Sequence, residues 1–150
     1  MLKGIDHRLN AEVLYVLRSM GHGDILIISD MNFPSKSLAK ETVHGELLRM
    51  ENISAPEAIK AILSVLPLDT FVEDFAGRMK VVDSPEKLPP VQEEAMSAIT
   101  AEEGSGRNMV PIERFAFYDL ARNAYAVIQT GEQRLYGCFM LRKGIIEPEG

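Results

Sequence analysis

Cysteine is nearly absent from this sequence, and its few histidines are scattered. Cys138 is the single cysteine, so neither an internal disulfide nor a cysteine-based zinc site can form. His7, His22 and His44 share no i, i+4 spacing, and no H-E-x-x-H motif is present. We therefore expect no bound metal. The lack of disulfides makes the cytoplasm the expected location.

Positive charge and long apolar runs are also scarce. The 16 Lys and Arg against 22 Asp and Glu leave a net charge of -6, and no segment concentrates basic residues. Nucleic-acid binding depends on such clusters, so we expect no nucleic-acid partner. No apolar run approaches the ~18 residues of a membrane span, and the N-terminal "MLKGIDHRLNAE" lacks the apolar core of a signal peptide. We expect no membrane partner either.

What is present is typical of an ordinary globular protein. The 150 residues are 46% hydrophobic and 25% charged, with no internal repeat and no long linker. The Pro-rich segment "DSPEKLPPV" (83–91) has the composition of a surface loop. A chain of this length is long enough to bury a substantial core. We therefore expect residues 1–150 to form a single domain.

Apolar spacing and capping residues predict four helices. Asn10 is a candidate N-cap for the first, and Gly21 ends its periodic pattern. Ser54 and Glu57 form a capping box at the start of the second, with a proline in its first turn. The predicted helical ranges are 9–21, 54–66, 90–104 and 111–124.

Short apolar segments between these helices predict strands. The isoleucine-rich run 24–30 is typical of a strand buried on both faces. Further strands are predicted at 43–50 and 70–82, the latter interrupted near Gly77. Residues 125–146 are predicted to form a hairpin of two strands around "TGEQ". The alternation of helices and strands predicts an α/β fold, a mixed β-sheet covered by helices.

The corner "GHGD" (21–24) raises a functional question. Gly21 and Gly23 are explained by a helix stop and a tight turn, which would make His22 a simple turn residue. The same glycines also leave His22 uncrowded, and Asp30 stands at the carboxyl end of the following strand, where ligands bind in open α/β sheets. A phosphate loop is excluded because such loops run strand, glycines, helix, and here the order is reversed. Both the structural and the functional interpretation remain open from the residues alone.

Four motifs make the chain resemble a known family. These are "MGHGD" (20–24), "SDMNFP" (29–34), "RFAFYDLARNAYAVIQTGE" (114–132) and "LYGCFMLRKGII" (135–146). In this order they are similar to the ribose pyranase/L-fucose mutarotase family, although residues 50–105 match only loosely. Members of that family interconvert ring forms and anomers of free sugars without a cofactor. They assemble as rings, typically decamers of two stacked pentamers. The resemblance therefore implies a ring-forming subunit.

The same resemblance implies the site residues. The family's catalytic histidine matches His22 and its sugar-binding aspartate matches Asp30. The family's basic or imidazole residue matches Arg107. An arginine at this position resembles the fucose branch of the family. Its Tyr-Gly-Asn signature matches Tyr136, Gly137 and, with a change, Cys138, whose thiol is a weaker hydrogen-bonding group than an amide.

Sugar ring opening suits these residue types. A proton must reach the ring oxygen while the anomeric hydroxyl loses one, and histidine exchanges protons near neutral pH. The function expected is a cofactor-independent mutarotase acting on L-fucose or a related monosaccharide. Two alternatives use the same scaffold: a non-catalytic monosaccharide-binding protein linked to sugar transport, and a structural ring protein with no ligand. From the residues alone, Cys138 could equally be a small core side chain.

Overall fold

A strand buried on both faces organises the structure. In the computed structural model, which describes residues 1–149, β1 (Ile25–Ser29) lies near the centre of a six-stranded sheet. The other strands are β2 (Leu48–Met50), β3 (Ala76–Met79), β4 (Val110–Ile112), β5 (Ala126–Thr130) and β6 (Phe139–Arg142). The helices are α1 (Ala11–Ser19), α2 (Ser35–Ala39), α3 (Ala55–Leu63), α4 (Pro90–Glu103) and α5 (Arg114–Arg122).

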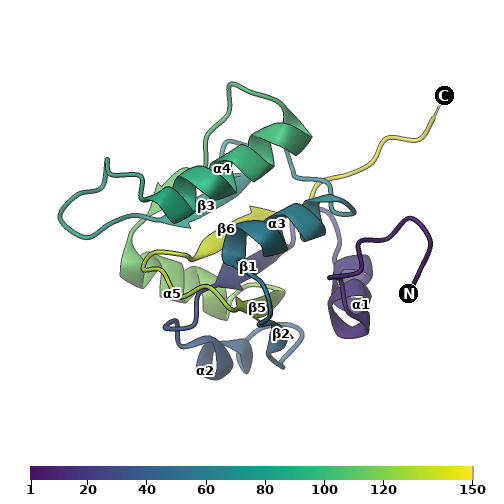
Figure 1. The fold of residues 1–150 in the computed structure, drawn as a ribbon, viewed down its shortest axis with the longest axis horizontal. Coiled ribbons are helices and arrows are strands. Elements are labelled where there is room, and N and C mark those ends of the chain that lie inside the picture. The colour runs from purple at the N-terminus through teal and green to yellow at the C-terminus, as the bar shows by residue number, and fades with distance from the viewer. Residues whose placement is uncertain (150) are drawn as a thin grey trace.

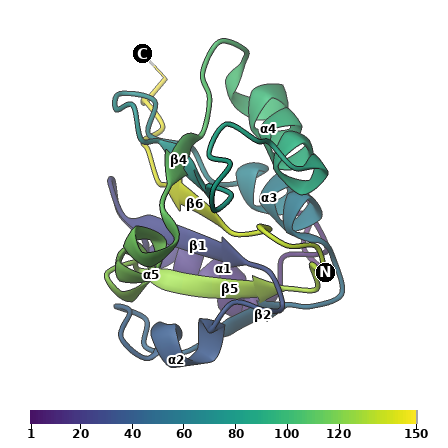
Figure 2. The same cartoon turned by 90° about the vertical axis from the view of Figure 1, so that its left-hand side faces the viewer.

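Side chains alternate across the sheet and divide the core into two clusters. Leu26 and Ile28 face one side of the sheet, where they pack with apolar residues of α1, α3 and α4. Ile27 faces the other side, against α2 and α5. Figures 1 and 2 show the result, with α3 and α4 on one face of the sheet and α2 and α5 on the opposite face. The predicted α/β class, a mixed sheet covered by helices, is confirmed.

Two predicted helix starts are confirmed by their capping bonds. The side chain of Asn10 accepts a hydrogen bond from the Val13 amide at 2.9 Å, so α1 begins where its N-cap indicates. Ser54 and Glu57 form the reciprocal bonds of a capping box at the start of α3. Among residues 1–149, no helix is long and apolar enough to cross a membrane.

The predicted C-terminal hairpin is wrong. Both of its strands exist, but the sheet order is β2-β5-β1-β6-β3-β4, so β1 lies between β5 and β6. β5 pairs with β1 in parallel and β6 pairs with it antiparallel. The segment 131–138 therefore crosses the carboxyl end of β1, and the Thr130 hydroxyl donates to the Ser29 carbonyl at 2.8 Å on the way. This crossing brings Tyr136 and Gly137 beside Asp30.

Three other boundaries differ from the predictions. Pro111 lies in the edge strand β4, where a missing amide is tolerated, and the helix predicted from 111 begins at Arg114. The strands predicted at 43–50 and 70–82 are confirmed in shortened form as β2 and β3. The interruption predicted near Gly77 is wrong, because Gly77 lies inside β3 and pairs with both neighbouring strands. The short helix α2 was not predicted, because five residues carry too little periodic pattern.

Candidate functional site

The predicted site residues form two groups at opposite ends of β1. His22 precedes the strand and Asp30 follows it, with Tyr136 and Gly137 near Asp30. At roughly 3.3 Å per residue, the strand separates the two groups by about 15 Å. A single chain therefore does not bring all six predicted residues into one pocket. Within one chain Asp30 cannot orient the His22 imidazole.

The imidazole of His22 has a different acidic partner, Asp69. His22 Nε2 lies 3.1 Å from Asp69 Oδ2, and the His22 side chain is 50% exposed whereas that of Asp69 is 6% exposed. The other oxygen, Asp69 Oδ1, is buried and has no hydrogen-bond partner among residues 1–149. A buried carboxylate oxygen without a donor is unfavourable, so the pair carries an uncompensated acceptor at this end of β1.

Backbone contacts from the end of β6 hold this pair together. The Gly23 amide donates to the Lys143 carbonyl at 2.8 Å, which fixes the turn that carries His22. Gly23 has a φ of 88°, a conformation that glycine adopts without strain. The Asp69 amide donates to the Arg142 carbonyl at 2.9 Å. Arg142 at the end of β6 and Lys143 directly after it therefore position the aspartate and the histidine turn.

Arg107 joins the same group through the loop that follows Asp69. Its guanidinium donates to the backbone carbonyls of Thr70 and Val72 and lies over the Phe75 ring, 4.5 Å from the centroid. These contacts fix the 69–75 loop against the residues preceding β4. His22, Asp69 and Arg107 thus form one group at the amino end of β1, which we call the histidine group.

The second group is built around Asp30, which is buried. Its Oδ1 accepts from the amides of Asn32 and Phe33, both at 3.0 Å, and its Oδ2 accepts from the Gly137 amide at 3.2 Å. Burial raises the pKa of Asp30, while the Cys138 thiol and these amides work in the opposite direction. Asp30 therefore fixes the turn after β1 to the segment before β6.

Gly137 and Cys138 complete the packing behind Asp30. A Cβ atom at Gly137 would lie 2.7 Å from Glu132 Cγ and 3.3 Å from the Asp30 Cβ, so only glycine fits. Cys138 is buried with Ile27 in the core cluster that faces α2 and α5. Burial, with the adjacent Asp30 carboxylate, raises the pKa of its thiol well above the ordinary value. Cys138 is consequently an unreactive core thiol.

Tyr136 is the open member of the second group, which we call the tyrosine group (Asp30, Tyr136, Gly137 and Cys138). Its side chain is half-buried, and its hydroxyl accepts a hydrogen bond from the Val82 amide at 3.3 Å. Its φ is 62°, in the left-handed region that residues with a Cβ seldom occupy. Strained backbone of this kind is often found at functional sites.

Sequence reasoning missed Asp69 and Gln92. Asp69 follows "VLPL" with no motif, and its partner lies 47 positions earlier in the chain. Gln92 is fully buried in α4, and it donates to the Tyr136 carbonyl at 3.1 Å. Only one feature of the sequence could have indicated Gln92, namely that it is a polar residue on the apolar face of a predicted helix. Within residues 1–149, no cluster of three or more His, Cys, Asp or Glu side chains could hold a metal ion.

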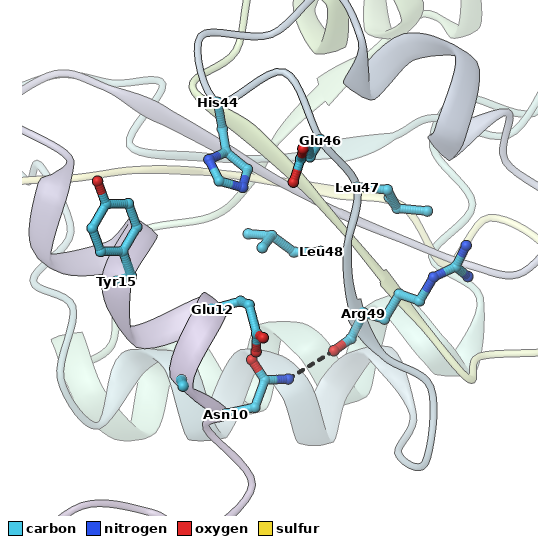
Figure 3. A pocket seen from close by; sticks show the side chains of 9 residues that line it. Asn10, Glu12, Tyr15, His44, Glu46, Leu47, Leu48 and Arg49 are labelled. Carbon is cyan, nitrogen blue, oxygen red and sulfur yellow. Dashed lines mark hydrogen bonds between the residues drawn. The ribbon is translucent and has the colours of Figure 1, made fainter.

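A groove of about 680 Å³ lies away from both groups. It runs between α1 and the segment that leads into the edge strand β2, and Figure 3 shows Tyr15, Glu12 and His44 around it. The Asn10 side chain closes one end by donating to the Arg49 carbonyl at 2.9 Å. None of the predicted site residues lines this groove.

Comparisons with known proteins agree with the resemblance noted in the motifs. The model of the RbsD / FucU transport protein family matches residues 3–146. The fucose mutarotase of Danio rerio is 44% identical over 152 residues, covering 99% of this chain and 97% of that protein. The solved structure of Atu2016, a candidate sugar-binding protein, has a TM-score of 0.96 at 57% identity, covering 98% and 97% of the two chains. The fucose mutarotase of Streptococcus pneumoniae in complex with L-fucose has a TM-score of 0.87 at 31% identity, covering 97% and 100%. The chain therefore belongs to the RbsD / FucU family.

Proposed function

We propose that this protein is a cofactor-independent mutarotase that interconverts the anomers of L-fucose by acid–base ring opening. The observation that carries the proposal is the half-exposed His22 imidazole with its Nε2 3.1 Å from the buried Asp69 carboxylate. The names of the relatives, fucose mutarotases at up to 44% identity, support L-fucose as the substrate. A cytoplasmic location, suggested by the single cysteine, is part of the same proposal.

The nitrogen of the His22 imidazole that Asp69 leaves free determines how His22 exchanges a proton with the sugar. A carboxylate beside Nε2 favours the tautomer that carries its hydrogen on Nε2, which leaves Nδ1 to accept or donate the substrate proton. In ring opening, one proton leaves the anomeric hydroxyl and another reaches the ring oxygen. When His22 carries the extra proton, the Asp69 carboxylate stabilises the imidazolium by a charge-assisted hydrogen bond. As these protons move, the bond between the anomeric carbon and the ring oxygen breaks, and it re-forms on closure without any change of oxidation state, so no cofactor is needed.

The tyrosine group supplies further contacts for the sugar: a hydroxyl donor, an aromatic ring and backbone atoms. Because the Val82 amide donates to the Tyr136 hydroxyl, the phenolic hydrogen is free to be donated to a sugar oxygen. The ring can also cover an apolar face of the sugar. Gly137 offers backbone atoms, whereas Asp30 holds their positions through its three accepted hydrogen bonds. We assign Cys138 to the support of Asp30, since its side chain is buried.

We further propose that adjacent copies of the chain complete the site. The histidine group of one copy would face the tyrosine group of the next, as a ring of like subunits allows. Exposed apolar side chains border both groups: Phe71 is 70% and Val72 37% exposed beside Asp69, and Leu135 is 67% exposed beside Tyr136. Such side chains favour burial against another chain. The ring expected from the family resemblance, a decamer of two pentamers, would provide this arrangement. Arg107 then supplies its remaining N–H donors to sugar hydroxyls.

The competing function is monosaccharide binding without catalysis. The family's description as transport proteins and the sugar-binding description of Atu2016 favour it. The same residues would bind the sugar in both cases, so the two functions differ only in the rate of anomer exchange. Binding alone gives no reason for an imidazole paired with a buried carboxylate, which is why we favour catalysis.

Exchange NMR on equilibrated L-fucose separates the two. Wild-type protein is expected to accelerate magnetisation transfer between the α and β anomeric protons, and His22→Ala is expected to abolish the acceleration while part of the binding persists. His44→Ala is the matched control, because His44 is a half-buried histidine outside both groups. Line broadening without exchange by the wild type would support binding alone. A fully active His22→Ala variant would refute the role given to His22.

A further inference from the structure

A buried polar pair lies directly behind Tyr136. We infer that Gln92 and Arg78 are positioning residues that hold Tyr136 in its reactive orientation, an inference that rests on the role proposed for Tyr136. Gln92 is fully buried in the first turn of α4, and Arg78 in β3 is 9% exposed. Neither residue belongs to the predicted site.

Gln92 holds the backbone of Tyr136. Its Nε2 donates to the Met79 carbonyl at 2.7 Å and to the Tyr136 carbonyl at 3.1 Å, so both amide hydrogens are used. The end of β3 and the segment before β6 are thereby tied to α4. Because Tyr136 has a φ of 62°, its conformation needs support from its surroundings, and this double donor provides it.

Arg78 fixes the orientation of Gln92. Its Nη1 donates to the Gln92 Oε1 at 3.2 Å. A flipped amide would set the oxygen of Gln92 against two carbonyl oxygens and its NH₂ group against the guanidinium. The network therefore allows a single orientation. Among residues 1–149, Arg78 forms no ion pair within 4.0 Å. Its buried positive charge is therefore held mainly by neutral acceptors. Burying a charge in this way destabilises the fold, so stability does not explain the arrangement.

Arg78 also reaches the hydroxyl end of Tyr136. Its Nη2 donates to the Pro85 carbonyl at 3.2 Å, and Pro85 lies in the loop whose Val82 amide donates to the Tyr136 hydroxyl at 3.3 Å. The carbonyl of Tyr136 is held through Gln92 and its hydroxyl through the loop. One guanidinium thus connects the supports at both ends of this tyrosine.

The test is a double-mutant cycle read by L-fucose exchange NMR at saturating sugar. Gln92→Glu keeps the volume and the acceptor for Arg78, but it removes both hydrogen bonds donated to the carbonyls. Misplacing a catalytic group by about 1 Å can cost up to ~10²-fold, so we expect Gln92→Glu to slow the exchange by about tenfold or more. In a Tyr136→Phe background it should have no further effect, because the group that it positions is already absent.

Two further variants separate positioning from stability. Thr42→Val is the matched control, since it removes a buried hydroxyl that donates to the Ala39 carbonyl at 2.6 Å and belongs to neither group. It should leave the exchange rate within about twofold. Arg78→Lys keeps the charge but cannot hold Gln92 and Pro85 together, and it should slow exchange less than Gln92→Glu does.

The outcomes of these experiments test the positioning role separately from the proposed function. Full activity in Gln92→Glu and Arg78→Lys, or equal slowing in the Tyr136→Phe background, overturns the positioning role. Full activity in Tyr136→Phe also overturns it, because no reactive hydroxyl would then be positioned. A wild-type protein that does not accelerate exchange contradicts the proposed function itself. An active wild type beside an unaffected Gln92→Glu contradicts only this inference.

Discussion

Replacing Asp69 by Asn tests the imidazole–carboxylate pair with almost no change in shape. The substitution removes the negative charge 3.1 Å from His22 Nε2 but leaves an amide oxygen able to accept the same hydrogen bond. His22 can therefore keep its tautomer, while its protonated form loses a partner of opposite charge. The expected effect falls on proton transfer and not on sugar binding.

The size of the effect follows from the exposure of the pair. A hydrogen bond to a charged group contributes about 1.5–3 kcal/mol. The His22 side chain is 50% exposed, so water screens the interaction and the lower end applies. A loss of about 1.5 kcal/mol in the transition state slows exchange by about tenfold. The Michaelis constant for L-fucose should change much less.

The assay is anomer exchange of L-fucose by NMR, with urea unfolding to check stability. Asp74→Asn is the control, because Asp74 lies in the same loop but pairs with Arg142, 2.6 Å away, and not with His22. Stability of Asp69→Asn should stay within about 1 kcal/mol of wild type, since the buried Oδ1 has no donor to lose. An Asp69→Asn variant with the wild-type rate would refute the role of the pair.

Two further predictions concern the support of the tyrosine group. Gly137→Ala places a Cβ 2.7 Å from Glu132 Cγ, so urea unfolding should show a loss of about 1–3 kcal/mol, and an unchanged midpoint would contradict this packing. Arg134→Met leaves the Glu132 carboxylate, which is 3% exposed, without the guanidinium that donates from Nε at 2.8 Å, and should cost about 1–3 kcal/mol at pH 7. Burial acts to raise the pKa of Glu132, but Arg134 outweighs it and the net shift is downward. The stabilisation from this ion pair is fully present at pH values above the ordinary pKa of Glu. It is lost as the pH falls through the lowered pKa of Glu132. The stability difference between wild type and Arg134→Met should therefore shrink on acidification, and a difference that does not change with pH would contradict the ion pair.

Local signals predicted the elements of the fold but not their pairing. The buried run of β1 and the capping box at Ser54 depend on neighbouring residues, and both were confirmed. The hairpin around "TGEQ" was wrong, because β5 and β6 each pair with a strand about 100 positions earlier. Turn residues indicate that a chain changes direction, but they do not say which strand it meets next.

The same limit applies to the site. A motif marked His22 because two glycines surround it, and the end of the predicted strand marked Asp30, whereas the family resemblance marked Tyr136. Asp69 could not be predicted, because its approach to His22 depends on the backbone bonds that Arg142 and Lys143 make to both segments. The strand predicted over 24–30 already placed His22 and Asp30 at its two ends. Nothing in the sequence indicated that Arg107 joins the first of these residues and Tyr136 the second.

The most direct test of the account mixes two variants that are each defective in one half of the site. His22→Ala keeps the tyrosine group and Tyr136→Phe keeps the histidine group, so each homogeneous oligomer should carry one defective half in every site. In oligomers assembled from equal amounts of both, about a quarter of the interfaces would join two intact halves. We therefore predict that mixed oligomers recover about a quarter of the wild-type rate of L-fucose anomer exchange. A mixture no faster than the average of its two components would contradict a site shared between neighbouring subunits.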